Sequence, residues 1–155
     1  MIVVVTDVAA PPQVLHDLVL DVDVHADSLS GSGESATTST GRRVLRAGDE
    51  VTFTARHLGV RWTMTSRVSV AERPHRVVDE QVRGPFRRLR HEHLFTATPA
   101  GTRMTDRVEV ALPGGPLGAL AVRLVAGPYL RRLLRERAAH LRAVAERGAA
   151  PPPAP

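Results

Sequence analysis

The sequence contains no cysteine, no lysine and few aromatic residues, and each absence excludes a class of site. Without cysteine there is no disulfide, thiolate zinc site or cysteine nucleophile, which fits a reducing compartment. With 3% aromatic residues, the chain offers few rings on which nucleic-acid bases stack. The apolar run Ile2–Val5 is too short for a signal peptide, and no stretch approaches the roughly 20 apolar residues of a membrane span. We therefore expect a cytoplasmic protein without a membrane span.

All positive charge comes from arginine, with 21 arginines against 16 acids and a formal net charge of +5. Residues 1–41 contain acids but no arginine, and all the arginines follow. A basic chain raises the question of nucleic-acid binding, but no nucleic-acid motif accompanies the charge. Since a lysine-free chain rich in Arg, Ala, Val and Pro is typical of a high-GC genome, we expect no nucleic-acid partner.

Length and an apolar content of 43% indicate one globular domain. We assign residues 1–147 to it and expect a disordered Pro/Ala tail at 148–155. Near the N-terminus the pattern predicts a strand, two short helices and a polar edge strand, at Ile2–Thr6, Gln13–Leu20, Val22–Leu29 and Glu34–Thr40, in that order.

Runs of alternating apolar and polar residues, each bounded by turn residues, then predict an antiparallel meander. The runs are Val51–His57, Val60–Val70, Arg76–Arg83, Leu89–Ala97 and Arg103–Ala111. Helical periodicity from Leu117 to Arg147 predicts a long amphipathic helix, which Gly127-Pro128 must kink or interrupt. Most of its arginines are expected on the solvent-facing side, Arg137 among them. The order predicts an α+β fold in which a curved sheet wraps around one helix and encloses a cavity.

Polar residues fall on the inward face of two neighbouring strands. His91 and His93 alternate with Leu89 and Phe95, and Asp106 alternates with Met104 and Val108. A four-residue turn at Thr98–Gly101 pairs Phe95 with Met104, His93 with Asp106, and His91 with Val108. The turn Gly84-Pro85-Phe86 most simply sets Gln81 opposite His91 and Asp79 opposite His93.

This polar layer has two interpretations. A histidine between carboxylates in a partly dry cavity is suited to general acid/base chemistry. A buried cross-strand pair of His93 and Asp106 also satisfies the hydrogen-bonding needs of its members without any chemistry. His91, with no acid directly opposite, is the better candidate to touch a ligand, and Trp62 and Met64 are expected in the cavity wall.

Other chemistries have weaker support. His91-x-His93 has the spacing of a metal-ligand pair on a strand. However, the glutamate and the further histidine that complete the cupin metal motif are missing, so we expect no metal. Neither a serine elbow, a phosphate loop nor a dinucleotide fingerprint is present.

The same stretch resembles the START-like polyketide cyclase and lipid-transport superfamily. The resemblance rests on Val77-x-Asp79-x-Gln81-x-x-Gly84-Pro85-Phe86-x-x-Leu89-x-His91-x-His93-x-Phe95, on Gly101-Thr102-x-Met104-Thr105-Asp106-x-Val108, and on Leu112-Pro113-x-Gly115-x-Leu117-Gly118. It implies a helix-grip fold whose cavity holds hydrophobic small molecules. Val77 and Leu89 stand where the family usually has an aromatic residue and a tryptophan, which implies a roomier or reshaped pocket.

The resemblance makes a cofactor-independent cyclase of a polyketide-like metabolite our first hypothesis, with His91, His93, Asp106 and Asp79 as catalytic residues. We expect ligand contacts from Gln81, Trp62, Met64, Phe53, Ser66, Leu89, Phe95, Met104 and Tyr129. The alternative is a non-catalytic carrier or sensor of a lipid-like or polyketide-like ligand. A third reading is a partner-binding protein that uses its arginine-rich helix, and a homodimer stays open.

Overall fold

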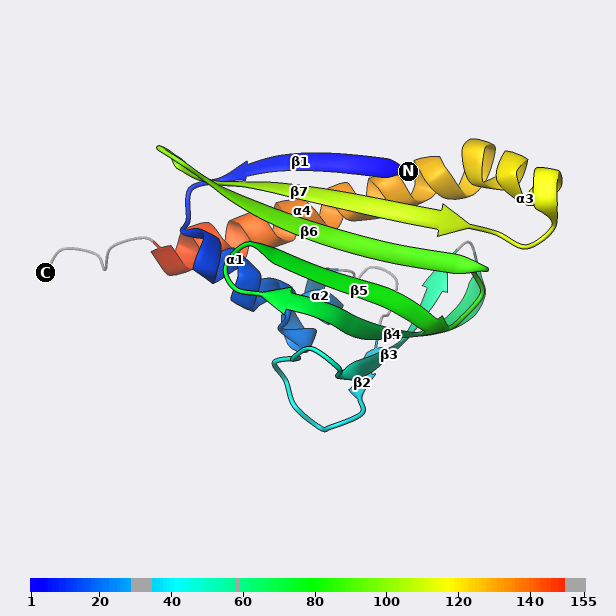
Figure 1. The fold of residues 1–155 in the computed structure, drawn as a ribbon, viewed down its shortest axis with the longest axis horizontal. Coiled ribbons are helices and arrows are strands. Elements are labelled where there is room, and N and C mark those ends of the chain that lie inside the picture. Colours follow the sequence, from blue (N-terminus) through cyan, green and yellow to red (C-terminus); the bar gives the residue numbers. More distant parts are fainter. Residues whose placement is uncertain (29–34, 58, 150–155) are drawn as a thin grey trace, which may run out of the picture.

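A computed structural model of the chain describes residues 1–28, 35–57 and 59–149. The elements follow the predicted order, with a strand, two short helices, a meander and a long helical run (Figure 1). The bounds are β1 (Ile2–Val8), α1 (Pro12–Val19), α2 (Val22–Ser28), β2 (Ser35–Thr38), β3 (Glu50–His57), β4 (Val60–Glu72), β5 (Arg76–Arg83), β6 (Arg88–Thr98), β7 (Gly101–Ala111), α3 (Gly115–Ala121), η2 (Val122–Ala126) and α4 (Gly127–Ala149).

The strands form one antiparallel sheet in the order β1-β7-β6-β5-β4-β3-β2. The predicted meander is therefore confirmed, and the first strand closes against the last. Figure 1 shows the curved sheet in front of α4, with α1 and α2 near one end of that helix and α3 at the other. The chain thus has the α+β helix-grip architecture.

Apolar side chains from the sheet and the helices meet on the inner face of the sheet. Alternation sends one side of each strand toward α4, whose buried residues recur at helical spacing. The main core joins Val51, Val77, Phe95 and Met104 of the sheet with Ala138, Leu141 and Ala145 of α4, and with Leu15 and Val19 of α1. A second cluster packs the N-terminal half of α4 against β1 and β7. Its members are Ile2, Val4, Val108 and Leu134.

The regular α-helix is interrupted directly before Gly127-Pro128, as predicted, although the run stays helical. It passes from α3 through one π-helical segment, η2, directly into α4. In this wider turn the Gly127 N–H donates to the carbonyl of Val122, five residues back. The added residue accommodates a proline that has no N–H of its own to donate.

Ion pairs join the acidic N-terminal segment to the arginine-bearing remainder. Asp7 accepts from Arg103 at 2.8 Å, and Asp17 accepts from Arg73 at 2.9 Å. These pairs lie at the surface, so their net contribution to stability is small. The uneven charge along the sequence is thus a charge difference between parts of one domain.

The structure moves some predicted boundaries. Helix α4 runs to Ala149, so residues 148 and 149 are helical and do not belong to a disordered tail. Residues 150–155, Leu29 of the predicted second helix and Glu34 of the predicted edge strand lie outside the described residues.

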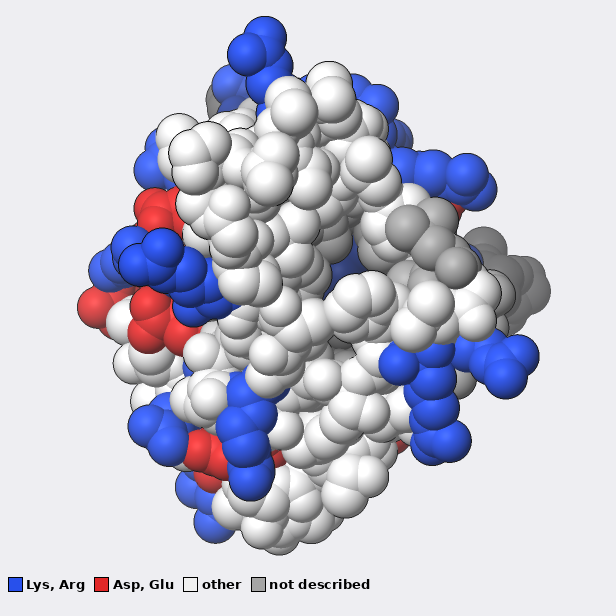
Figure 2. Space-filling model, turned by 90° about the vertical axis from the view of Figure 1, so that its right-hand side faces the viewer, with Lys and Arg blue, Asp and Glu red and all other residues white. Residues whose placement is uncertain are grey.

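Among the described residues, no helix is long and apolar enough to cross a membrane. The end of the molecule that carries α3 nevertheless exposes large apolar side chains, Leu117, Leu120, Leu124 and Val125. Figure 2 shows this end as a mainly uncharged surface with arginines around it and a hollow near its centre.

Candidate functional site

The polar layer predicted on the inner face is present at the centre of the sheet. His93 pairs with Asp106 and His91 with Val108 between β6 and β7, as expected. All three polar side chains are buried, because their neighbours on the same face belong to the core.

The predicted register of the preceding hairpin is wrong by two residues. Asp79 lies opposite His91, and Val77 lies opposite His93. The reason lies in the turn, where the Gln81 side chain donates to the Phe86 carbonyl at 2.7 Å and accepts from the Phe86 N–H at 3.3 Å. Strand pairing therefore ends at Glu80. Gln81 thus stabilises this turn through its side chain, and its contact with a ligand stays a prediction.

Asp106 holds both imidazole rings. The His91 Nε2–H donates to Asp106 Oδ1 at 3.0 Å. His93 Nδ1 lies 2.6 Å from the same oxygen, although without the alignment of a hydrogen bond. The two rings lie 3.9 Å apart between centroids. A single buried carboxylate thus contacts both histidines and orients His91 through a hydrogen bond.

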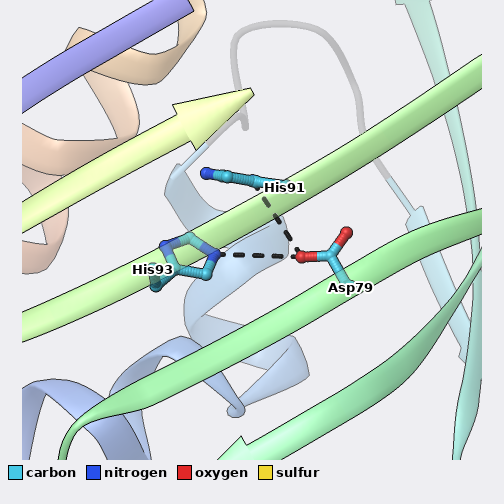
Figure 3. Close-up of side chains that lie close together, drawn as sticks. All are labelled: Asp79, His91 and His93. Carbon is cyan, nitrogen blue, oxygen red and sulfur yellow. Dashed lines mark ion pairs between the residues drawn. The ribbon is translucent and has the colours of Figure 1, made fainter. Parts of the chain in front are cut away.

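Asp79 lies on the other side of the two rings and is the most exposed member of the cluster. Its Oδ1 is 4.0 Å from His91 Nδ1 and 3.8 Å from His93 Nε2, and 26% of its side chain is exposed. Figure 3 shows both rings near this carboxylate from the adjacent strand. His91 therefore does face an acid, contrary to the expectation that it has none opposite.

The cluster separates the charge states of its members. Burial and the neighbouring His93 together lower the pKa of His91 to about 4, against the opposing effect of Asp106 and Asp79. Burial also disfavours charged His93, but Asp106 and Asp79 outweigh it and raise the pKa of His93. Although burial opposes ionisation of Asp79, His93 and His91 lower its pKa to about 2. The cluster thus favours the charged form of His93, the neutral form of His91 and the ionised forms of both aspartates.

Arg137 of α4 lies near the cluster, a position that was not predicted from the sequence. It was expected on the solvent-facing side of its helix, yet it is 7% exposed and lies close enough to lower the pKa of Asp79. Its Nε has no hydrogen-bond partner. Helical spacing indicates that Arg137 faces inward, because Leu134, three residues before it, and Leu141, four residues after it, are buried on the same side of the helix.

The remaining predicted ligand residues differ in depth. Leu89, Phe95, Met104 and Ser66 are buried on the inner side, while Phe53, Met64 and Tyr129 are half-buried. Trp62 is 37% exposed near the start of β4, so it lies at the edge of the inner face and not at its centre. Ligand contact by these residues stays a prediction.

Two surface grooves lie elsewhere. One, of about 300 Å³, runs between β1 and α4 along Val3, Val5 and Arg135. The other, of about 520 Å³, lies beside Arg87, Val110 and Val122. Neither groove is lined by the histidine cluster.

Comparisons with known proteins agree with this architecture. The family described as "Polyketide cyclase / dehydrase and lipid transport" matches residues 1–146. No curated protein matches the sequence. Solved structures do match the fold, and the three described below are each less than 25% identical, so their likeness is one of fold.

Three of these structures illustrate the range. TTHA0849 from Thermus thermophilus is 21% identical, with a TM-score of 0.70 over 93% of this chain and 98% of that one. The ZhuI aromatase/cyclase from Streptomyces sp. R1128 is 17% identical, with a TM-score of 0.71 over 96% and 94%. The di-domain aromatase/cyclase BexL, from the BE-7585A biosynthetic pathway, is 20% identical, with a TM-score of 0.77 over 97% of this chain and 50% of that one.

The match over almost the whole sequence, on a sheet that grips a C-terminal helix, means that the chain belongs to the polyketide cyclase/dehydrase and lipid-transport family.

Proposed function

We propose that the protein binds an apolar metabolite bearing several oxygen atoms, on the inner side of the sheet, and closes a ring in it. The family to which the chain belongs and the aromatase/cyclase names of two structural neighbours support a reaction of this class. Ring closure by carbon–carbon bond formation needs acid/base groups and a held conformation of the chain, but no redox partner.

The observation that carries the proposal is a set of buried polar atoms without partners. Ser66 Oγ, His93 Nε2 and Arg137 Nε are all buried and lack a hydrogen bond. Ser66 pairs with Val51 of the core across β3 and β4, so it lies on the same inner side as His93. A buried donor left unsatisfied costs about 1–3 kcal/mol. Carbonyl, enolate or hydroxyl oxygens of a ligand would accept these hydrogen bonds.

The charge states of the two histidines assign them different roles. Protonated His93 donates a proton from Nε2 to the carbonyl oxygen of the ligand as the new bond forms at its carbon. Neutral His91 accepts the proton that leaves the attacking α-carbon, on Nδ1, which Asp106 leaves free. Asp106 positions both rings, and Asp79 stabilises the imidazolium. One proton is taken and one is given, so the step balances without a cofactor.

A non-catalytic carrier is the second candidate, and one observation favours it. Both imidazoles already lie against Asp106, so a structural role also accounts for the contacts of the cluster with this carboxylate. In this case Arg137 and Ser66 fix ligand oxygens, and the histidines only shape the polar end of the site.

Ligand binding and turnover separate these functions. A panel of aromatic polyketides and reactive polyketone chains is screened by thermal shift and native mass spectrometry, and turnover of each binder is followed by liquid chromatography. A cyclase loses turnover in His91→Gln and His93→Gln but still binds. Turnover unchanged in both variants contradicts the mechanism, and a carrier shows binding without any turnover. If nothing in the panel binds, both functions are wrong for this class of ligand.

A further inference from the structure

Three metal-ligating side chains converge at one point inside the sheet. Asp79 of β5 and His91 and His93 of β6 each turn one ligand atom toward this point, and the three atoms lie within 4.8 Å of one another (Figure 3). No metal was expected from the sequence, because the glutamate after His93 and the further histidine of the cupin motif are missing. The register of the β5–β6 hairpin supplies an acid from the adjacent strand instead.

The spacing of the ligand atoms is close to that of a bound ion. Asp79 Oδ1 is 4.0 Å from His91 Nδ1 and 3.8 Å from His93 Nε2. A point equidistant from the three atoms lies at most about 2.5 Å from each, whereas zinc is held at roughly 2.0–2.2 Å by imidazole nitrogen and carboxylate oxygen. A shift of about half an ångström per side chain closes this gap, which is within the reach of a small side-chain rotation.

Asp106 acts as the outer carboxylate that such sites use to orient their histidines. Because His91 Nε2 donates its hydrogen to Asp106, the lone pair of neutral His91 is on Nδ1 and faces Asp79. His93 Nδ1 lies against the same carboxylate, which leaves Nε2 to face Asp79. Both free nitrogens therefore point to the same side, toward the third ligand.

Two features of the metal-free cluster are unfavourable as they stand. His91 Nδ1 and Asp79 Oδ1 are both acceptors and face each other with no donor between them. His93 Nε2 is buried without a hydrogen-bond partner. One cation between the three atoms removes both defects, since it accepts electron pairs from all of them.

We propose that Asp79, His91 and His93 form a binding site for one divalent transition-metal ion of the zinc type. Two histidines and a carboxylate leave one coordination position open, as in catalytic rather than structural zinc sites. Asp79, with 26% of its side chain exposed, is the most exposed of the three ligands. The two aspartates offset its charge, whereas Arg137 opposes it from α4.

The ion and the proton on His93 Nε2 compete for the same lone pair. Because the ion would also occupy Nδ1 of His91, the acid/base step of the proposed ring closure belongs to the metal-free protein, and metal binding does not depend on that step. With the ion bound, an oxygen of the ligand would meet a Lewis acid where it otherwise meets an imidazolium. Metal binding is measured without any organic ligand, so its failure and the failure of the proposed function are separate results.

The test is a metal titration of tag-free protein after treatment with a chelator. Zn²⁺ is titrated by calorimetry and Co²⁺ by its visible absorption. We expect one ion per chain, with affinity at least about tenfold weaker in Asp79→Asn and about 10–100-fold weaker in Asp106→Asn. The exposed His75 is the matched control, and His75→Gln binds as the unaltered protein does.

Several results would overturn the site. They are no binding by the unaltered protein, weak binding of several ions per chain, equal affinity in Asp79→Asn, or loss of binding in His75→Gln. Circular dichroism checks that each variant is folded. If Asp79→Asn does not fold, the Co²⁺ spectrum of the unaltered protein still decides, because coordination by two imidazoles gives bands that the aquo ion lacks.

Discussion

His91 and Asp106 are joined by a hydrogen bond of 3.0 Å that determines what the rest of the cluster can do. The two residues are not opposite each other in the strand register, since Asp106 pairs with His93. The bond is therefore diagonal across β6 and β7, and it orients the ring of His91 so that Nδ1 faces Asp79 on β5. In this way one carboxylate links three strands of the inner face.

We expect Asp106→Asn to be the most destabilising isosteric change in the cluster. Asp106 is 3% exposed and contacts both histidines. Without its charge His93 keeps only the more distant Asp79 as a counter-ion, and breaking a buried pair in this way costs about 3–5 kcal/mol. Urea unfolding measures the loss, and two-dimensional NMR shows whether the pKa of His93 falls. The matched control is Asp7→Asn, whose surface pair with Arg103 is exposed. Equal losses in the two variants contradict the role of Asp106.

The sequence predicts the fold well, because the signals that determine it are local. Alternation identifies the faces of β6 and β7, and a short turn fixes the pairing of His93 with Asp106. The turn at Gly84 is different, because the Gln81 side chain takes part in it. Gly84 has φ of +156°, and a Cβ there would meet Gln81. Such side-chain closure has no periodic signature, so the register between Asp79 and His91 could not be predicted.

The inward position of Arg137 was missed for a related reason. An arginine side chain is charged and is therefore expected in solvent, and Arg137 is one of several arginines in this helix. Whether one of them turns inward depends on the rotation of α4 against the sheet, which is a tertiary property. The buried neighbours Leu134 and Leu141 indicate that Arg137 faces the sheet, but only if helical spacing is given more weight than the charge of the side chain.

We expect Arg137→Met to leave the ligand-free protein as stable as before or slightly more stable. Arg137 is buried with an unpartnered Nε, and an apolar side chain of similar length avoids the cost of a buried charge. The same change removes a group that lowers the pKa of Asp79, so that pKa rises. Urea unfolding and ligand titration are the measurements, and ligand affinity falls if Arg137 holds a ligand oxygen.

The exposed Arg135, on the same helix, is the matched control for this change. Arg135→Met leaves both stability and affinity unchanged. A large loss of stability in Arg137→Met, with no effect on affinity, means that Arg137 is a structural residue and not a ligand contact.

His25 makes the stability of the domain depend on pH. Its ring stacks on Phe53 at 4.1 Å, and burial, then Arg137 of α4 and His93 of β6, lower its pKa well below 6.5 against the opposing pull of Asp79 of β5. Below about pH 6.5, His25 is protonated in the unfolded chain but stays neutral in the folded chain until a lower pH. Stability is therefore lost as the pH falls below about 6.5.

His25→Phe tests this link, because phenylalanine keeps a ring against Phe53 and does not titrate. The contribution of His25 is at most about 1.4 kcal/mol per pH unit, and less because its side chain is partly exposed. Urea unfolding of both proteins between pH 5 and 8 should give a shallower slope for the variant. Equal slopes would mean that the pKa of His25 is not lowered.

Thr102 connects β7 to the loop that follows β1. Its hydroxyl, in a residue 1% exposed, donates to the carbonyl of Ala10 at 2.7 Å. Thr102→Val keeps the shape but leaves that carbonyl without its donor, which costs about 1–3 kcal/mol. We expect a matching decrease in the free energy of unfolding in urea. The control is Thr63→Val, which removes a hydroxyl contact with Thr54 at 3.3 Å in an exposed setting. If the two variants lose the same stability, burial of the Thr102 hydrogen bond does not matter, and β1 is held to the sheet by its strand pairing and core contacts alone.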